Sequence, residues 1–240
     1  MSAARAACAR DHSDAQQIVR SYPIVTQGDG SMRGIIVVAL SLAANGTQAM
    51  QPPGDAQIKA DLSRGEELET RIAGDLNSDG VDDIAYIVRG DDKRTLRVRM
   101  ADKGKIDFGH APLGMLDLDA YPLGAAEMSV AKGVLVVKDL TGGTTATTAT
   151  YRFRLDPEAG RMKLIGLDAT MYSRTFAHDG SELSWNLLTG DVITSTLKLS
   201  GSGENASYQK TGLKRFRRPI GVYWMEDAPI GDDAFDAAAK

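Results

Sequence analysis

Oxygen-bearing side chains recur at regular intervals in one short stretch, residues 74–83. Counted from the first of them, positions one, three, five and nine of the stretch carry carboxylate or amide groups: Asp75, Asn77, Asp79 and Asp83. Gly80 stands where a calcium loop turns sharply, and the carbonyl of Val81, at position seven, adds a backbone oxygen. Three carboxylates this close repel one another unless a hard cation lies among them. The spacing therefore predicts a Ca²⁺ site.

The segment that follows the loop distinguishes it from an EF-hand. An EF-hand has a bidentate Glu at position twelve, where this chain has Tyr86. Residues 84–88 are apolar and partly β-branched, which favours a strand after the loop rather than a helix. The alternative interpretation is a turn that binds nothing, since Asn, Asp and Gly are ordinary turn residues.

The order Asp-x-Asn-x-Asp-Gly-x-x-Asp, preceded by Gly and followed by an apolar strand, resembles the FG-GAP calcium loop of β-propeller proteins. The resemblance implies that the side chains of Asp75, Asn77, Asp79 and Asp83 and the carbonyl of Val81 bind the ion. Because the protein supplies all of these ligands, we expect the Ca²⁺ to be structural and not catalytic.

A second apolar feature lies near the start of the chain. Met32 and Arg33 precede an uncharged run over residues 34–44, and small residues at Thr47 and Ala49 follow it. This is the pattern of a signal peptide over 32–49, and the run is too short to span a bilayer. We therefore predict a periplasmic protein, with residues 1–31 as a non-native upstream extension. The alternative is a buried core segment.

The rest of the chain alternates strand-like runs with turn clusters. We expect a linker over 50–60, one all-β calcium-binding domain over 61–226 and a flexible tail over 227–240, for which a short helix is the alternative. Residues 95–100 illustrate the pattern, with Arg97 and Arg99 on a solvent face, and residues 109–124 are expected to form loops. No segment has the pattern of a helix of three turns. The expected fold is an antiparallel meander, a small or incomplete β-propeller-like domain.

Composition excludes several functions. The formal net charge is −4, which argues against nucleic acids and anionic membranes as partners and fits a cationic protein. The single cysteine, Cys8, lies before the predicted cleavage site. His110 and His178 lie outside any recognisable catalytic pattern, and Asp117 and Asp119 read as ordinary loop residues. We therefore expect a protein that is not an enzyme.

The arrangement of a signal peptide, one early FG-GAP-type loop and a series of strands resembles a group of periplasmic immunity proteins. Residues 164–168, 179–182 and 186–190 add to this resemblance, which covers most of residues 60–225. Its members protect bacteria against lysozyme-like toxins delivered by a type IV secretion system. The resemblance implies a protein that binds and blocks a peptidoglycan hydrolase.

A protruding loop that presents a rigid side chain would suit such an inhibitor. The candidate partner-binding residues lie in or beside the hairpin over 172–185: Tyr172, His178, Asp179 and Trp185. Core packing is the competing role for the two aromatic residues, and turn formation for His178 and Asp179. The alternative function is an FG-GAP-type adhesion or cell-wall-binding module without inhibitory activity.

Overall fold

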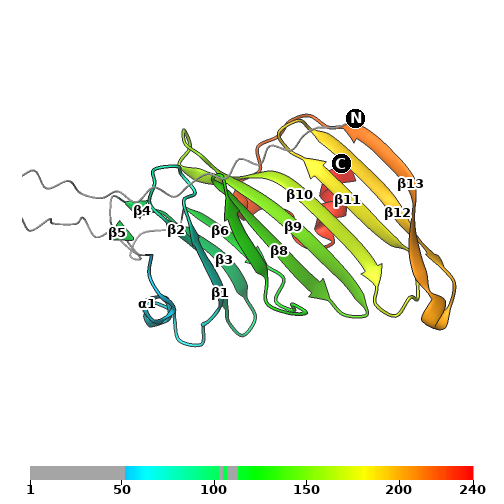
Figure 1. Cartoon of the computed structure of the whole chain (residues 1–240), viewed down its shortest axis with the longest axis horizontal. Coiled ribbons are helices and arrows are strands. Elements are labelled where there is room, and N and C mark those ends of the chain that lie inside the picture. The colour runs from blue at the N-terminus through cyan, green and yellow to red at the C-terminus, as the bar shows by residue number, and fades with distance from the viewer. Residues whose placement is uncertain (1–51, 103–104, 107–112, 240) are drawn as a thin grey trace, which may run out of the picture. The chain divides into compact units, whose positions relative to one another are not determined.

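The computed structural model describes residues 52–102, 105–106 and 113–239. The predicted signal peptide, the upstream extension and His110 lie outside the described residues. The protein is built from two antiparallel sheets (Figure 1). Four strands form the first sheet, in the order β1-β2-β3-β6: β1 (Glu67–Gly74), β2 (Asp83–Arg89), β3 (Arg94–Arg99) and β6 (Gly114–Leu118). Two further short strands, β4 (Ala101–Asp102) and β5 (Lys105–Ile106), pair with each other.

The second sheet is a meander of seven strands in which each strand pairs with its neighbours in sequence. Its members are β7 (Glu127–Ala131), β8 (Val134–Gly142), β9 (Thr145–Asp156), β10 (Arg161–Ser173), β11 (Gly180–Asn186), β12 (Asp191–Ser200) and β13 (Ser207–Arg217). A 3₁₀ turn, η1 (Gly203–Asn205), lies between β12 and β13. The all-β, antiparallel fold is confirmed. The seven-stranded sheet is a simple meander in which short turns connect successive strands, whereas residues 100–113 separate β3 from β6 in the four-stranded sheet.

The strand β6 was not predicted, since it lies within the segment expected to form loops. Its burial alternates strictly: Gly114, Leu116 and Leu118 are buried, whereas Met115 and Asp117 are exposed. Only five residues carry this alternation, and the prolines and glycines around them obscured it in the sequence. The strand completes the first sheet by pairing with β3.

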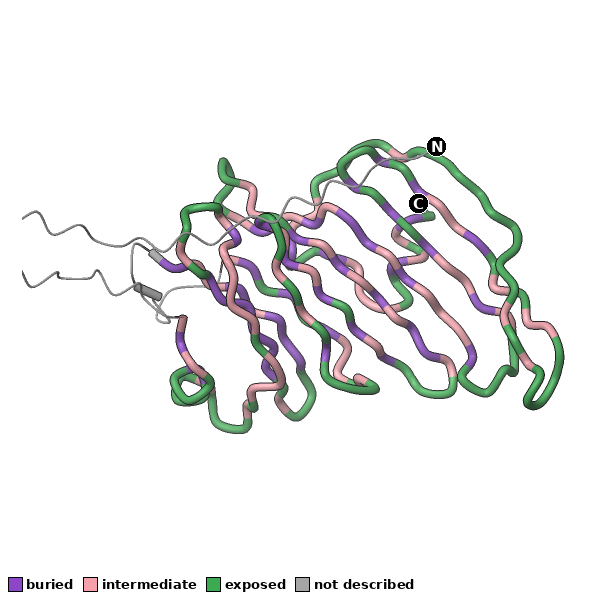
Figure 2. The backbone as a smooth tube through the Cα atoms, in the orientation of Figure 1, coloured by how far each residue is buried: buried purple, intermediate pink, exposed green. Residues whose placement is uncertain are grey.

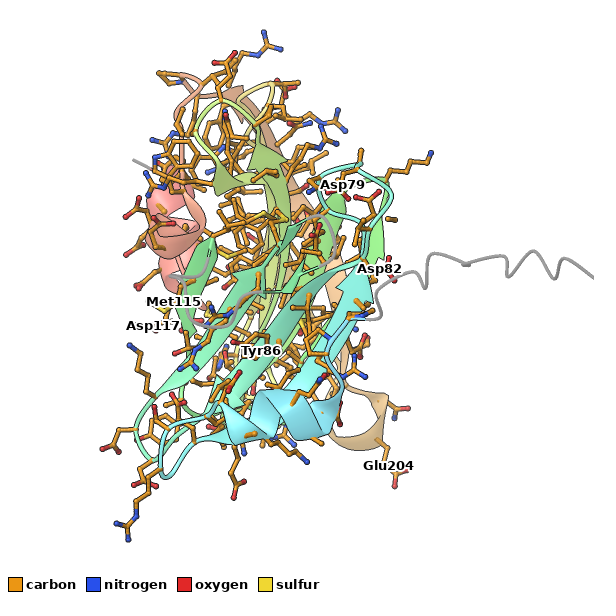
Figure 3. All side chains as sticks on the ribbon, turned by 90° about the vertical axis from the view of Figure 1, so that its left-hand side faces the viewer. Asp79, Asp82, Tyr86, Met115, Asp117 and Glu204 are labelled. Carbon is orange, nitrogen blue, oxygen red and sulfur yellow. The ribbon has the colours of Figure 1, made fainter. Side chains whose placement is uncertain are left out.

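The strand β2 is buried on both faces, which explains its continuous apolar sequence. Ala85 and Ile87 belong to the main core, which contains residues of both sheets. Tyr86 and its neighbours Ile84 and Val88 pack on the opposite face against Ile58 of the short helix α1 (Asp55–Ala60). Figure 3 shows α1 on this side of the sheet and labels Tyr86. The helix occupies much of the segment expected to be a linker.

The C-terminal segment also packs onto the protein. Met225 of the 3₁₀ turn η2 (Met225–Asp227) is fully buried against β6 and β10. The helix α2 (Asp233–Ala239) buries Ala234 and Ala238 in the main core and contacts β10 and β11. For residues 227–240 we expected a flexible tail or a short helix, and the structure has the helix. The alanines that suggested a frayed end are instead small enough for a helix to lie close to the sheet.

None of the helices in the described ranges has the length and apolar character needed to cross a membrane.

Candidate functional site

The predicted calcium loop connects β1 to β2, and its own side chains fold it. The Asp75 carboxylate accepts N–H groups from Ser78 (2.6 Å) and Gly80 (3.0 Å). The Asn77 side-chain oxygen accepts the Asp79 N–H (2.9 Å), and Asp79 in turn accepts the N–H of residue 81 (2.8 Å). Gly80 has φ of +83°, the left-handed conformation that the sharp turn was expected to need. These hydrogen bonds fix the conformation of the loop.

Asp83 closes the loop from within the protein. Its side chain is fully buried and accepts N–H groups from Leu76 and Ala101, both at 2.8 Å. Burial raises the pKa of the Asp83 carboxyl against the effect of these two bonds, and the charges of Asp79 and Asp75 raise it further. The charges of Asp75 and Asp79 thus act on the Asp83 carboxyl. A cation among them would relieve that repulsion.

In this structure, however, the side-chain oxygens of Asp75, Asn77 and Asp79 accept hydrogen bonds from N–H groups of the loop itself. Within the described ranges, no group of three or more His, Cys, Asp or Glu side chains is arranged as a metal centre. Burial tends to raise the pKa of Asp75, but its bonds with the Gly80 and Ser78 N–H groups lower it below the ordinary value. The residue types fit Ca²⁺, which hard oxygen ligands bind, and the carboxylates are close enough to interact. Calcium binding thus stays a prediction.

The loop lies where the two sheets meet. Val130 of β7 packs tightly against Gly74, and the strands β1 and β7 are in contact. On the other side, the loop shares a cleft of about 300 Å³ with the β7–β8 turn, where Lys132 and Gly133 lie beside Asn77 and Ser78. We call this contact of β1 and its loop with β7 and β8 the inter-sheet seam. A ligand that stiffens the loop would stiffen the seam.

A buried ion network crosses the same seam, and sequence reasoning missed it. Arg94 of β3 has no exposed surface. Its guanidinium group donates to both carboxylate oxygens of Glu69 (2.6 Å each) and both of Asp139 (2.9 Å each). Burial tends to lower the pKa of Arg94, but these hydrogen bonds and charges raise it above the ordinary value. Glu69 also accepts the Ala126 N–H (3.0 Å). The network therefore joins β1, β3 and β8 with every charge paired.

The β10–β11 loop, residues 174–179, brings together two of the predicted partner-binding residues. His178 is exposed, and the Nε2 atom of its ring lies 2.8 Å from the hydroxyl oxygen of Thr145. Its Nδ1 lies 2.6 Å from the Asp179 carbonyl oxygen, so Nδ1 carries the proton and the Thr145 hydroxyl donates to Nε2 in the neutral ring. The Asp179 carboxylate binds Lys198 (2.8 Å), and this hydrogen bond, with that from the Leu199 N–H, lowers its pKa.

Two residues at the base of the loop hold it in one shape. The buried Ser173 hydroxyl accepts N–H groups from Thr175 (3.3 Å) and Ala177 (2.9 Å). The hydroxyl of Tyr208, on β13, accepts the Ser173 N–H (2.9 Å) and donates to the His178 carbonyl oxygen (2.8 Å). The loop is thus preorganised by contacts both within itself and with a strand that is distant in sequence.

Phe176, at the centre of the loop, is exposed and held in an unusual conformation. It has φ of +52°, a left-handed value that non-glycine residues rarely adopt, and 42% of its surface is exposed. Its ring lies 5.6 Å from that of Tyr208. Such backbone strain at an exposed aromatic is a feature of functional loops. Phe176 was not among the sequence candidates, although it is the single aromatic among small and polar neighbours.

The other two candidates lie outside the loop. Tyr172 is half-buried near the end of β10, one residue before Ser173. Trp185 is buried in the main core, where its ring packs edge-on against Tyr223 (5.3 Å) and under the guanidinium of Arg218 (5.2 Å). Trp185 therefore supports the sheet and does not belong to the surface. The competing core role is the one that the structure shows for it.

A scan against family models and a search of curated proteins both returned no match. The functional conclusion therefore depends on the geometry of the sites.

Proposed function

We propose that the protein is a periplasmic inhibitor, an immunity protein that binds and blocks a lysozyme-like peptidoglycan hydrolase through the β10–β11 loop. One observation carries this proposal: a rigid loop presents a strained, exposed Phe176. Interfaces derive most of their affinity from a few aromatic or Arg anchors. A preorganised anchor binds tightly because little conformational entropy is lost when the partner arrives.

The chemistry of the loop suits the cleft of a glycoside hydrolase. Such a cleft binds a sugar chain and contains two catalytic carboxyl groups. Arg174, exposed and two residues before Phe176 in sequence, can donate hydrogen bonds to carboxylates. The Phe176 ring provides a flat apolar surface of the kind that fills a substrate cleft. A hydrogen-bond donor beside an exposed aromatic ring favours the cleft of a hydrolase as the partner over a flat cell-wall polymer.

Calcium has a supporting role in this proposal. The loop over residues 75–83 would bind Ca²⁺ through the oxygens of Asp75, Asn77, Asp79 and Asp83 and the carbonyl of Val81. The ion would replace repulsion among the carboxylates with coordination and thereby stabilise the inter-sheet seam. The β10–β11 loop belongs to the seven-stranded sheet, whereas the predicted calcium loop connects two strands of the four-stranded sheet. We therefore expect calcium to affect stability more than inhibition of a folded sample.

A lysis assay tests the proposal. The full chain, loaded with Ca²⁺, is titrated against a panel of lysozyme-like hydrolases acting on purified peptidoglycan. We expect stoichiometric inhibition of at least one enzyme and a loss of affinity of more than tenfold for Phe176→Ala. Leu188→Ala is the matched control, since Leu188 is also an exposed apolar residue in a turn of the same sheet. Its inhibition should equal that of the wild type.

Two results would contradict the proposal. The first is the absence of inhibition across the panel by folded, calcium-loaded protein. The second is inhibition that Phe176→Ala leaves unchanged, which would show that another surface meets the hydrolase. Retention of the protein on peptidoglycan without any inhibition would favour the alternative, a cell-wall-binding module.

A further inference from the structure

Positive charge is concentrated on the last strand of the seven-stranded sheet. Five of the 28 Lys and Arg residues of the chain lie within residues 207–222, and this segment has no Asp or Glu. The cations are Lys210, Lys214, Arg215, Arg217 and Arg218. This local excess contrasts with the net charge of −4 for the whole chain. A binding surface responds to local charge, so the net value does not decide what this strand can bind.

Two of these cations are available for a ligand. Lys210 pairs with Glu182 and Arg217 pairs with Asp191, while Arg218 stacks on Trp185. Lys214 and Arg215 are exposed, and no residue in the described ranges forms an ion pair with either. These two residues are adjacent, so their side chains lie on opposite faces of the strand, and only an approach to the sheet edge meets both.

Exposed apolar residues are interleaved with these cations. Leu213 and Phe216 flank the free pair and are 55% and 40% exposed. Ile220 and Val222, in the segment that leaves the strand, are 66% and 56% exposed. Four of the exposed large apolar residues in the described ranges thus fall within ten positions. Figure 2 shows the exposed course of β13 at the edge of the sheet. We call Leu213, Lys214, Arg215, Phe216, Ile220 and Val222 the basic edge.

We infer that the basic edge binds the surface of an anionic phospholipid bilayer. Lys214 and Arg215 would contact lipid phosphate groups, and Leu213 and Phe216 would enter the boundary between headgroups and acyl chains. Cations beside exposed apolar side chains are the composition of interfacial membrane-binding segments. This inference is independent of the proposed inhibitor function, because the β10–β11 loop is not part of the basic edge.

Other occupants of this edge fit the structure less well. A second copy of β13 would place its own cations against these, and the like charges would repel. Addition of an acidic strand from another protein requires a regular edge. However, β13 has a bulge where Gly212 and Leu213 lie opposite Ser195, between the pairs Thr196–Thr211 and Thr194–Lys214. Gly212 has φ of +60° there. The bulge twists the edge and limits strand addition.

Co-sedimentation with vesicles tests the inference. The full chain is incubated at low salt with vesicles of phosphatidylglycerol and phosphatidylcholine in equal parts, and separately with phosphatidylcholine alone. We expect binding to the anionic vesicles that weakens as NaCl is added, and none to the neutral ones. Since each cation near such a surface contributes about fivefold in binding, Lys214→Glu/Arg215→Glu should lower partitioning by about 25-fold or more.

The control variant is Lys59→Glu/Arg64→Glu, which makes the same charge change at two exposed cations on and beside α1. It should bind anionic vesicles like the wild type. Leu213→Ser/Phe216→Ser should also reduce binding, while thermal melting confirms that each variant is folded. Equal losses in both charge variants would overturn the inference, because binding would then follow net charge. The inference would also be overturned if the wild type did not bind anionic vesicles. In that case the basic edge would either bind acidic peptides or serve only to prevent aggregation at the sheet edge.

Discussion

Charged groups at the inter-sheet seam and in the β10–β11 loop are used in opposite ways. At the seam, Arg94 is enclosed by Glu69 and Asp139, and none of the three charges is open to a partner. In the β10–β11 loop, Arg174 and His178 are exposed, and hydrogen bonds hold the backbone instead. The seam fixes how the two sheets meet. The loop leaves the Phe176 ring exposed while its shape is already determined.

The difference explains why stability and function can be separated in this protein. A buried ion pair is costly to break because the remaining charge is left without a partner or solvent. An exposed anchor contributes little to folding, so its removal leaves the fold intact. Substitutions at the seam should therefore change the free energy of unfolding, whereas substitutions in the β10–β11 loop should change binding.

The largest effect is expected for Arg94→Ala. This change leaves Glu69 and Asp139 as two buried carboxylates close together, and we expect the free energy of unfolding to fall by about 3–5 kcal/mol. Urea denaturation at neutral pH measures the change. Arg89→Ala is the control, because Arg89 contacts the same Glu69 (3.4 Å) from a half-exposed position and should cost less than about 1 kcal/mol. Equal costs for both variants would show that the buried network is not what holds the seam.

The second largest effect is expected from calcium. At a hundred times its dissociation constant, a bound ion adds about 2.7 kcal/mol to the stability of the folded state. Asp79→Ala should abolish this gain, because it removes one of the predicted ligands. Asp82→Ala should keep the gain, since the exposed Asp82 falls outside the ligand spacing, although both residues lie in the same loop (Figure 3).

Thermal melting with Ca²⁺ and with a chelator measures both variants against the wild type. A wild type that melts at the same temperature in both conditions would remove calcium from the proposal. A larger loss in Asp82→Ala than in Asp79→Ala would show that the ligands are assigned to the wrong positions.

These two sites also show what the sequence can and cannot reveal. The loop over residues 75–83 is local: its side chains, its glycine and the strand that follows are contiguous, so their spacing is informative. Strands such as β9 and β10 were predictable from alternation for the same reason. The partners of Arg94 lie 25 and 45 residues away on other strands. Only the register of both sheets brings them together, and no local pattern encodes it.

The β10–β11 loop was only partly predictable from the sequence. His178 and Asp179 were predictable as turn residues beside a strand, and they do lie in the loop. Tyr208 holds the loop from 30 or more positions away, so its role was not visible. Trp185 is a strand residue whose alternation directs it to the core; its size suggested a binding anchor, but burial of a large aromatic is equally favourable inside the protein.

The pH dependence of stability sharpens the comparison further. Burial tends to raise the pKa of Glu69, but hydrogen bonds with Arg94 and the Ala126 N–H lower it below the ordinary value of 4.5. A lowered folded-state pKa stabilises the fold above the unfolded pKa, and this contribution is lost as pH falls through the folded value. The wild type should therefore lose stability as the pH falls below about 4.5.

Glu69→Gln removes this titration, so the stability of the variant should depend less on pH between about 5 and 3, although it is lower at neutral pH. Denaturation at a series of pH values gives the two slopes. Glu127→Gln is the control, because Glu127 is a mostly exposed residue in a surface pair with Lys138. Should the wild type and Glu69→Gln have the same slope, the seam would not be the acid-sensitive element.

The smallest effect on stability is expected for Phe176→Gly. Glycine adopts φ of +52° without strain, which favours the variant, while the loss of the contact with the Tyr208 ring disfavours it. These terms oppose each other, and we expect the free energy of unfolding to change by less than about 1 kcal/mol.

Tyr208→Phe is the informative companion, since it keeps the ring contact and removes only the hydroxyl that binds Ser173 and His178. If affinity for the hydrolase falls in both variants while stability falls only in the second, the anchor and the support of the loop are separate. A large loss of stability in Phe176→Gly would mean that the ring holds the loop together and that its exposure does not mark a binding anchor.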